Sequence, residues 1–404
     1  MGISQSHERA AHRRRVAYLS GSVAQALSIE PLVEFALTLA ANVHIDGPSV
    51  VQQSNARSAG IDSPLQSFVL DLAEAMLTGR RRTSYGKLNR HLESGAQILE
   101  ACDELDHAIE FAVYDRTSLA LAIDEFFRDF PGLDARIAGA LQHLTSPRVS
   151  LKLRGQLPVL PAAAGKLLRT SEEHASVFEL EAIAGSDPVF AGRLLGVANS
   201  AYFGYAAEIS NLRHAILRLG VPLARNVLMN AVFGPLFASS TLAELWRHSK
   251  LVAATAHELA IQCGYDRQIA YASGLLHDIG TLAINRAPQS ARVEQAGLLA
   301  AGFPLVYAET LIYGIDHAML GGQLLKEWSL PSEIADAVAR HHSPESTDSA
   351  LAAILYLAED EAAIDAAENL STGMRRAKAM EITGLDELSA SHINRESLVF
   401  ALAS

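Results

Sequence analysis

Residues 271–284 read YASGLLHDIGTLAI, and this stretch decides the fold of the chain. Its apolar residues recur at helical spacing up to the adjacent His277 and Asp278, and Gly280 follows where a helix C-cap glycine is expected. An imidazole and a carboxylate side by side on a rigid element can both bind one divalent cation. The stretch therefore predicts a helix that ends in a candidate metal site.

The helical pattern continues on both sides of this stretch. Apolar residues recur every three to four positions almost everywhere, for example over 242–263, 268–276 and 318–327, and strict alternation rich in Val, Ile and Thr is nearly absent. The fold class is therefore all-α. At 404 residues and 49% hydrophobic side chains, the chain is long enough for two or three domains.

Domain boundaries are indicated by two changes in composition. TSPRVSLKLRGQLPVLP (145–161) gathers three prolines and a glycine without helical periodicity, and the short polar SPESTDS (343–349) interrupts the pattern again. We expect two helical domains. They comprise a helical domain over 1–145, a linker over 146–149, a second domain over 150–345, and C-terminal helices over 346–404 that pack on the second domain.

Composition excludes several classes of protein. The net charge of -12 disfavours general nucleic-acid binding and anionic membranes, because the summed field repels phosphate. No apolar run reaches the about 20 residues of a membrane-spanning helix, and the N-terminus does not resemble a secretory signal. Cys102 and Cys263 cannot form a disulfide framework and are expected to be core filler. We expect a cytoplasmic protein with no membrane contact.

Histidines mark the region where chemistry is expected. Six of the fifteen lie between positions 248 and 342: His248, His257, His277, His317, His341 and His342. A single histidine on a helix is usually an ordinary hydrogen-bonded residue, but this grouping calls for more than that explanation.

Seven successive motifs carry a family resemblance. They are LPVLPAAAGKLL (157–168), AIAGSDPVFAGRLLGVANSAYFG (182–204), ISNLRHAILRLG (209–220), LWRHSKLVAATAHELA (245–260), YASGLLHDIGTLAI (271–284), YGIDHAMLGGQLLKEWSLP (313–331) and IADAVARHH (334–342). In order and spacing they resemble the HDOD domain over residues 150–345. The resemblance implies an HD-type helical bundle, related to HD phosphohydrolases and found mostly in bacterial signalling proteins without demonstrated enzymatic activity.

The resemblance also implies a set of metal ligands. Carried over residue by residue, the set is His248, His277, Asp278, His317, His341, His342 and a closing acid on a later helix. LYLAEDEA (355–362) offers Glu359 or Asp360 for that acid, and we prefer Asp360 on residue type. Such ligands suit one or two divalent ions of Mn, Fe, Zn or Mg. Without metal, the same His and Asp residues could hydrogen-bond one another and specify a helical core.

Two departures separate the chain from the HD-GYP cyclic-dinucleotide phosphodiesterases, which it also distantly resembles. Those enzymes place a phosphate-binding lysine where this chain has Thr281, and a Gly-Tyr-Pro loop where this chain reads SPEST (343–347). These losses favour a regulatory protein that acts by binding rather than by turnover. The alternative is a metal-dependent phosphohydrolase or cyclic-dinucleotide phosphodiesterase.

The N-terminal region shows a weaker internal similarity to the second domain. HRRRVAYLSGSVAQALSI from His12 parallels the segment from His248, His44 parallels His277, and HLESGAQIL from His91 parallels HAMLGGQLL from His317. This region therefore resembles a degenerate HD-GYP-like domain with its ligands eroded, suited to sensing or dimerising.

Several partners are expected for the whole protein. They are other signalling proteins, a second copy in a homodimer, and a cyclic dinucleotide. The basic clusters 13–15 and 80–82 could bind such an anion, although a solvated helix face or loop tip also explains them.

Overall fold

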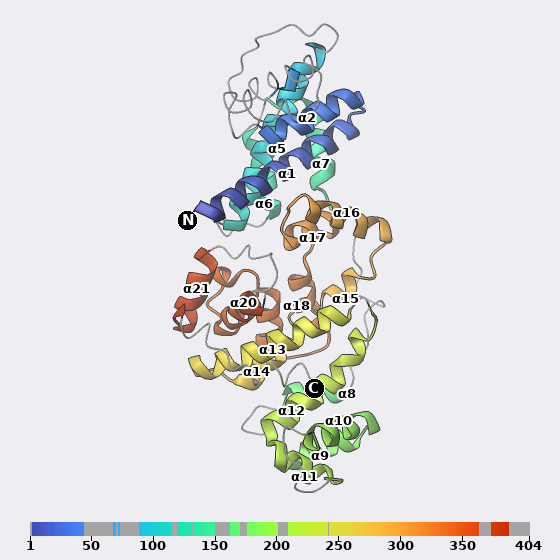
Figure 1. Cartoon of the computed structure of the whole chain (residues 1–404), viewed down its shortest axis with the longest axis vertical. Coiled ribbons are helices and arrows are strands. Elements are labelled where there is room, and N and C mark those ends of the chain that lie inside the picture. Colours follow the sequence, from blue (N-terminus) through green and yellow to red (C-terminus); the bar gives the residue numbers. More distant parts are fainter. Residues whose placement is uncertain are drawn as a thin grey trace. The chain divides into compact units, whose positions relative to one another are not determined.

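The computed structural model describes residues 2–43, 68–69, 72, 89–114, 119–130, 132–149, 162–169, 176–200, 209–240, 242–362 and 373–387. Every regular element in these ranges is an α-helix or a 3-10 helix (Figure 1), which confirms the all-α prediction. No single helix among them is long and apolar enough to cross a membrane. Only α11 (Leu212–Leu219) and α12 (Val221–Phe233) with the 3-10 turn that follows reach that length together, across a bend of 115°.

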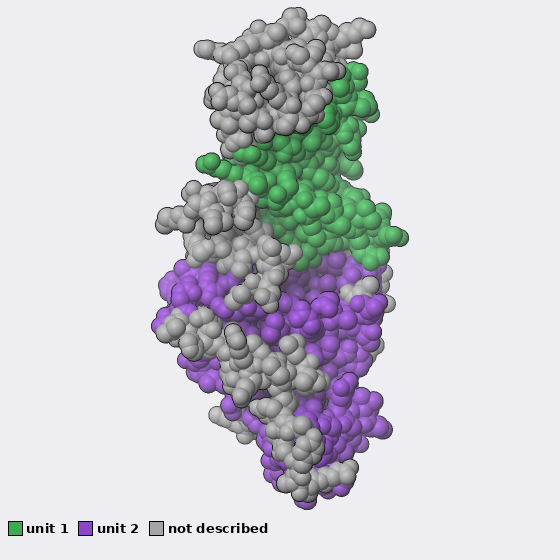
Figure 2. Space-filling model, in the orientation of Figure 1, with its two compact units in different colours: residues 1–150, 287–315 green, residues 151–286, 316–404 purple. Residues whose placement is uncertain are grey.

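The chain divides into two compact units, coloured separately in Figure 2. Unit 1 comprises residues 1–150 and 287–315, and unit 2 comprises residues 151–286 and 316–404. The division differs from the expected domains at one place, because the segment 287–315 lies within the expected second domain and yet groups with unit 1.

Unit 1 is a cluster of helices around α1. Its described elements are α1 (Gly2–Ala26), α2 (Pro31–Val43), α5 (Asn89–Tyr114), α6 (Leu119–Asp129), α7 (Ala135–Thr145), α16 (Gln289–Ala300) and α17 (Leu305–Tyr313). Helix α1 packs on α2, α5 and α7, and α5 packs on α6. Val16, Val23, Leu37 and Leu99 are fully buried between these helices. The unit therefore has a core of its own.

Specific contacts explain why 287–315 joins unit 1. The ring of Phe303 meets that of Tyr18 edge-on at 6.1 Å. The backbone N–H of Arg148 donates to the carbonyl of Ile312 at 2.9 Å. Gly314 ends α17 at a φ of +73°, where a Cβ would also approach Pro147 to 3.0 Å. Helices α16 and α17 thus pack on residues from the first part of the chain.

Unit 2 holds the site. Its described helices are α8 (Ala162–Arg169), α9 (Val177–Gly185), α10 (Pro188–Ala198), α11, α12, α13 (Ala243–Cys263), α14 (Arg267–Leu276), α15 (Thr281–Ile284), α18 (His317–Glu327), α19 (Ser332–Ala339), α20 (Ala350–Ala362) and α21 (Gly373–Thr383), with 3-10 turns η4 (Gly234–Phe237) and η5 (Pro344–Ser346). Helix α13 packs mainly on α14 and α20, while α18 packs on α19. One continuous apolar core runs through the unit, from Ala164 to Ala379.

Two glycines allow the helices around the site to approach closely. A Cβ on Gly274 would lie 2.7 Å from the Cα of Ala253, so α14 can lie against α13 only with glycine there. A Cβ on Gly280 would overlap the carbonyl oxygen of His317 and lie 2.6 Å from the amide nitrogen of Gly321.

The reason for Gly280 differs from the one expected. Helix α14 ends at Leu276, and Gly280 has φ -63° and ψ -26°, an ordinary helical conformation that other residues also adopt. The prediction of a C-cap glycine was therefore wrong. Glycine is needed there because the turn after Asp278 presses against the start of α18.

Candidate metal centre

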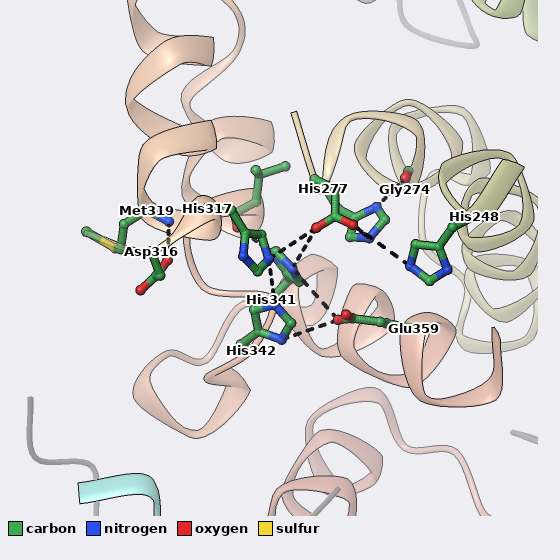
Figure 3. A network of polar contacts seen from close by, with 11 residues as sticks. His248, Gly274, His277, Asp316, His317, Met319, His341, His342 and Glu359 are labelled. Atoms are coloured by element: carbon green, nitrogen blue, oxygen red, sulfur yellow. Dashed lines mark hydrogen bonds and ion pairs between the residues drawn. The ribbon is translucent and has the colours of Figure 1, made fainter. Parts of the chain in front are cut away.

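Five helices of unit 2 bring their side chains to one cluster. His248 comes from α13, His277 and Asp278 follow α14, His317 is the first residue of α18, His341 and His342 follow α19, and Glu359 comes from α20. Figure 3 shows the five imidazoles and Glu359 converging. We call these seven residues the HD cluster. Asp316 caps α18 by accepting a hydrogen bond from the Met319 amide at 2.8 Å, which fixes the start of the helix that carries His317.

The Asp278 carboxylate lies at the centre of the HD cluster. Its Oδ1 is 3.1 Å from Nε2 of His317, and its Oδ2 is 3.2 Å from Nε2 of His277. His341 and His248 lie further away, at 3.9 and 4.0 Å from the nearer Asp278 oxygen. One carboxylate therefore faces four imidazoles.

His277 and His341 are held in the same way. Nδ1 of His277 donates to the carbonyl of Gly274 at 2.8 Å, and Nδ1 of His341 donates to that of Val338 at 2.7 Å. Both side chains are fully buried, and neither Nε2 atom has a hydrogen-bond partner. A neutral imidazole with a proton on Nδ1 carries a lone pair on Nε2. The Nε2 lone pair of His341 therefore points into the cluster, and so does the Nε2 atom of His277, which carries either a lone pair or a proton.

The outer part of the cluster is more open. His342 Nε2 lies 2.8 Å from His317 Nε2, and His342 Nδ1 lies 3.4 Å from Oε2 of Glu359. That oxygen is also 3.7 Å from His341 Nε2. The side chains of His248, His342 and Glu359 are 30%, 24% and 23% exposed, so solvent reaches the cluster from this side.

Burial and charge set the protonation of the cluster. Burial, with the charges of His277 and His317, lowers the pKa of His341 to about 3, and burial together with His277 lowers the pKa of His248 to about 4. Both imidazoles are therefore neutral at pH 7. Burial also raises the pKa of Glu359 to about 7.

Asp278 and His277 behave as an ion pair. Burial disfavours the charged form of each, but the neighbouring imidazoles hold the pKa of Asp278 well below its usual value, and Asp278 raises the pKa of His277. An imidazole lone pair and a carboxylate oxygen 3.2 Å apart would repel each other. A cation must therefore lie between them, either a proton on His277 or a metal ion.

The donor atoms fit a metal ion. The ligand atoms form three overlapping groups, and within each group all the atoms lie within 4.8 Å of one another. The groups are His277, Asp278 and His341; His248, His277 and Glu359; and His317, His341 and His342. The buried Nε2 atoms of His277 and His341 lack hydrogen bonds and have their Nδ1 atoms anchored, which is how metal-ligating histidines are usually oriented. Mixed imidazole and carboxylate ligands suit Mn, Fe or Zn.

One predicted ligand lies elsewhere. Asp360 does not point into the HD cluster but pairs with Arg376 of α21, and its neighbour Glu359 takes the position in the cluster. The preference for Asp360 was therefore wrong, and the alternative that LYLAEDEA also offered is the residue the structure brings to the site. The other six predicted ligands meet in the cluster. His257 lies outside it, beside Glu258 at 3.5 Å.

The basic clusters of the first 150 residues gain little support. Arg15 is 5% exposed and donates to both carboxylate oxygens of Asp106, at 2.7 and 2.8 Å, so it adds no charge to the surface. Residues 80–82 and His44 lie outside the described part of the chain.

Comparisons with known proteins agree with the fold. The HDOD domain family model matches residues 157–344. The chain is 25% identical over 193 residues to an uncharacterized protein of Treponema pallidum, covering 46% of this chain and 38% of that protein. It is also 25% identical over 199 residues to ribonuclease Y of Acholeplasma laidlawii, covering 46% of this chain and 32% of the enzyme. The chain thus spans well under half the length of either relative.

A solved structure shares the fold. It is the crystal structure of an HDOD domain protein of unknown function from Geobacter sulfurreducens, with a TM-score of 0.52 and 24% sequence identity. The alignment covers 61% of this chain and 91% of that one.

Proposed function

Residues 157–344 of this chain are an HDOD domain, and from that premise we propose that the protein is a regulatory protein in which unit 2 binds a divalent metal ion and acts by binding rather than by turnover. The observation that carries the metal is His341. Its neutral, fully buried imidazole aims a lone pair between Asp278 and Glu359, 3.9 and 3.7 Å away, which is too far for a hydrogen bond. A buried acceptor without a partner is costly, and a metal ion would satisfy it.

The residues that would hold the ion are those of the HD cluster. His277, Asp278 and His341 would form the buried side, and His248, His317, His342 and Glu359 the more open side. A bound divalent ion supplies Lewis acidity, which attracts an anionic ligand and acidifies coordinated water. The chain's own contribution is rigid orientation, because backbone carbonyls hold two of the imidazoles. In the absence of a metal ion, a proton on Nε2 of His277 would supply the positive charge beside Asp278.

Binding without turnover is favoured by what surrounds the HD cluster in sequence. Thr281, a neutral residue, begins α15 three residues after Asp278, where the resemblance to HD-GYP enzymes would place a phosphate-binding lysine. The segment after His342 forms the short turn η5 rather than a Gly-Tyr-Pro loop. Without a cation and a loop for substrate, a phosphodiester would be oriented poorly for attack.

The same proposal names the class of partner. We expect unit 2 to contact other signalling proteins, to form a homodimer, or to bind a cyclic dinucleotide through the metal ion. Each of these partners is compatible with an HD cluster that is open on the side of His248, His342 and Glu359.

Elemental analysis tests the metal directly. Protein purified without added metal or chelator should contain a divalent metal, and a His277→Ala, Asp278→Ala double variant should lose the share bound in the HD cluster, about one equivalent or more, while keeping its helical circular dichroism. A His143→Ala variant is the matched control, because His143 is exposed in α7 of unit 1. Full metal content in the double variant would remove the proposed site.

A second candidate function is metal-dependent phosphodiester hydrolysis. The observation that favours it is the complete donor set, five imidazoles and two carboxylates, together with similarity to ribonuclease Y. Assays on cyclic dinucleotides and on single-stranded RNA, with Mn²⁺ or Fe²⁺ supplied, separate the two functions. Metal-dependent turnover that is abolished in the double variant would favour the hydrolase, and stoichiometric metal without turnover would favour the regulatory protein.

A further inference from the structure

Unit 1 contains a second cluster of potential metal ligands, made by two helices that have no part in the HD cluster. We infer that His12 of α1 with Asp103 and His107 of α5 forms a binding site for a divalent transition-metal ion of the zinc class. The donor atoms of these three residues all lie within 4.8 Å of one another. The inference goes beyond the proposed function, because that function concerns unit 2 alone.

The ligand geometry rests on two rigid elements. Asp103 and His107 are four residues apart on α5, so they lie on the same face of the helix, with His107 Nε2 3.9 Å from Asp103 Oδ1. His12 reaches the same oxygen from α1, with its Nε2 3.0 Å away. Helices α1 and α5 pack directly on each other, so a shared ion would link them.

A second carboxylate orients His12. Nδ1 of His12 lies 2.7 Å from Oδ2 of Asp106, whose side chain is fully buried. Metal-ligating histidines usually donate their other ring N–H to a carboxylate in this way, which fixes the tautomer and leaves Nε2 as the ligand atom. Arg15 in turn donates to both oxygens of Asp106 and holds that carboxylate in place.

Charge favours a cation at this place. Arg15 offsets the charge of Asp106, and His12 donates to Asp106 through Nδ1–H. Burial lowers the pKa of His12, but its hydrogen bonds with Asp103 and Asp106 raise that pKa to about 9, so a metal ion would displace a proton from Nε2. The Asp103 carboxylate then faces imidazole nitrogens of His12 and His107, whose rings stack with their centroids 4.8 Å apart. Two imidazoles and one carboxylate are a common set for zinc and for other transition metals.

Exposure indicates the kind of site. The side chains of His12 and Asp103 are 8% and 17% exposed, whereas that of His107 is 56% exposed. His12 and Asp103 therefore lie mostly inside the protein, and His107 lies on the solvent side of the site. Three protein ligands leave a coordination position for water or for a donor from a partner.

The test uses the full chain carrying His277→Ala and Asp278→Ala, which removes the central carboxylate of the HD cluster, and the substitutions in unit 1 then show which share of the binding belongs to the His12 site. Apo protein is titrated with Zn²⁺ by calorimetry and with Co²⁺ by visible absorption. We expect about one equivalent to bind, with a Co²⁺ spectrum typical of mixed nitrogen and oxygen ligands. In the same background, His107→Ala and Asp103→Asn should each weaken binding at least about tenfold.

One control variant changes a histidine of unit 1 that lies outside the His12 site. His143→Ala removes an exposed histidine of unit 1 outside the cluster and should bind Zn²⁺ like the parent. His107 is mostly exposed, so its substitution tests the site without disturbing the core. Equal Zn²⁺ binding by the parent, His107→Ala and His143→Ala, or no binding by a parent with native circular dichroism, would overturn the inference and leave a proton-mediated pair of His12 with Asp103.

Discussion

Glu359 and Asp360 are adjacent acids on α20 with different partners, and this difference can be measured. Glu359 faces His341 and His342 in the HD cluster, whereas Asp360 pairs with Arg376. We expect Glu359→Gln to lower metal affinity about tenfold or more, because a ligand or near-ligand carboxylate is lost. Asp360→Asn should leave the affinity unchanged. Metal titration of both variants by calorimetry checks this, and equal losses in the two would contradict the assignment.

The sequence could not separate these two acids for a physical reason. Every residue from Leu351 to Ala358 is buried, so α20 has no polar face that would tell which of the next two side chains points inward. The residue that attracts Asp360, Arg376, lies on another helix. By contrast, each of the six other residues that meet in the cluster lies in one of the motifs that carry the family resemblance, and the resemblance implied them together.

Cys102 should be chemically inert in the folded protein. Its side chain is fully buried, and burial raises the pKa of its thiol to about 12. The thiolate is the reactive species, so alkylation of Cys102 by iodoacetamide at pH 8 should be roughly tenfold slower or more than alkylation of the half-buried Cys263. Mass spectrometry of timed reactions measures both rates. In guanidinium the two cysteines should be alkylated at similar rates. Similar rates in the native protein would show that Cys102 is not buried.

At the scale of elements, the glycine in the HDIG turn determines how α18 meets the turn. A Cβ at Gly280 would overlap the His317 carbonyl, so Gly280→Ala should lower the free energy of unfolding by about 3 kcal/mol or more. Gly192, exposed in α10 with no atom near its would-be Cβ, is the matched control. Gly192→Ala should be neutral or should raise that free energy by about 0.5–1 kcal/mol. Urea unfolding measures both, and a neutral Gly280→Ala would contradict the close approach.

One guanidinium of helix α21 pairs with two acids of α20, on which the helix also packs. Arg376 pairs with Asp360, with Glu361 at 2.6 Å and with Glu387 at 3.0 Å, and the side chains of Asp360 and Glu361 are only 11% and 6% exposed. Arg376→Ala would leave two buried carboxylates without this partner, which should cost about 2 kcal/mol. Arg247→Ala, which removes an exposed pair with Glu244, should cost little. Unfolding midpoints that fall equally in the two variants would argue against this role.

The helices themselves were largely predictable. The patterns over 242–263, 268–276 and 318–327 correspond to α13, α14 and α18, whose observed bounds differ by one residue at most. The periodicity is strong there because each helix buries one broad face. The pattern could not show why glycine is needed at position 280. Gly280 allows the turn after Asp278 to lie close to α18, and these two segments are distant in sequence.

In the whole molecule, the assignment of residues 287–315 to unit 1 could not be read from composition. Most of the segment 287–315 lies between two motifs of the same family resemblance, 271–284 and 313–331, yet the segment packs with α1 and with residues 147–149 in unit 1. Membership of a unit depends on contacts such as Tyr18 with Phe303, which join residues far apart in sequence. Periodicity within a segment carries no such information.

The two proposed metal sites belong to different units, so metal binding at one can be tested without the other. The HD cluster draws on unit 2, and the His12 site draws on unit 1. A metal lost on chelation should therefore be recovered at each site independently, and substitutions at one should leave affinity at the other unchanged.

The most direct test of the central claim is an anomalous difference map from crystals of the full chain, recorded on both sides of the absorption edge of the metal that elemental analysis identifies. We expect a peak bounded by His277, Asp278 and His341, within coordination distance of their Nε2 and carboxylate atoms. If the crystallised protein holds stoichiometric metal and the map has no peak there, metal binding by the HD cluster is contradicted.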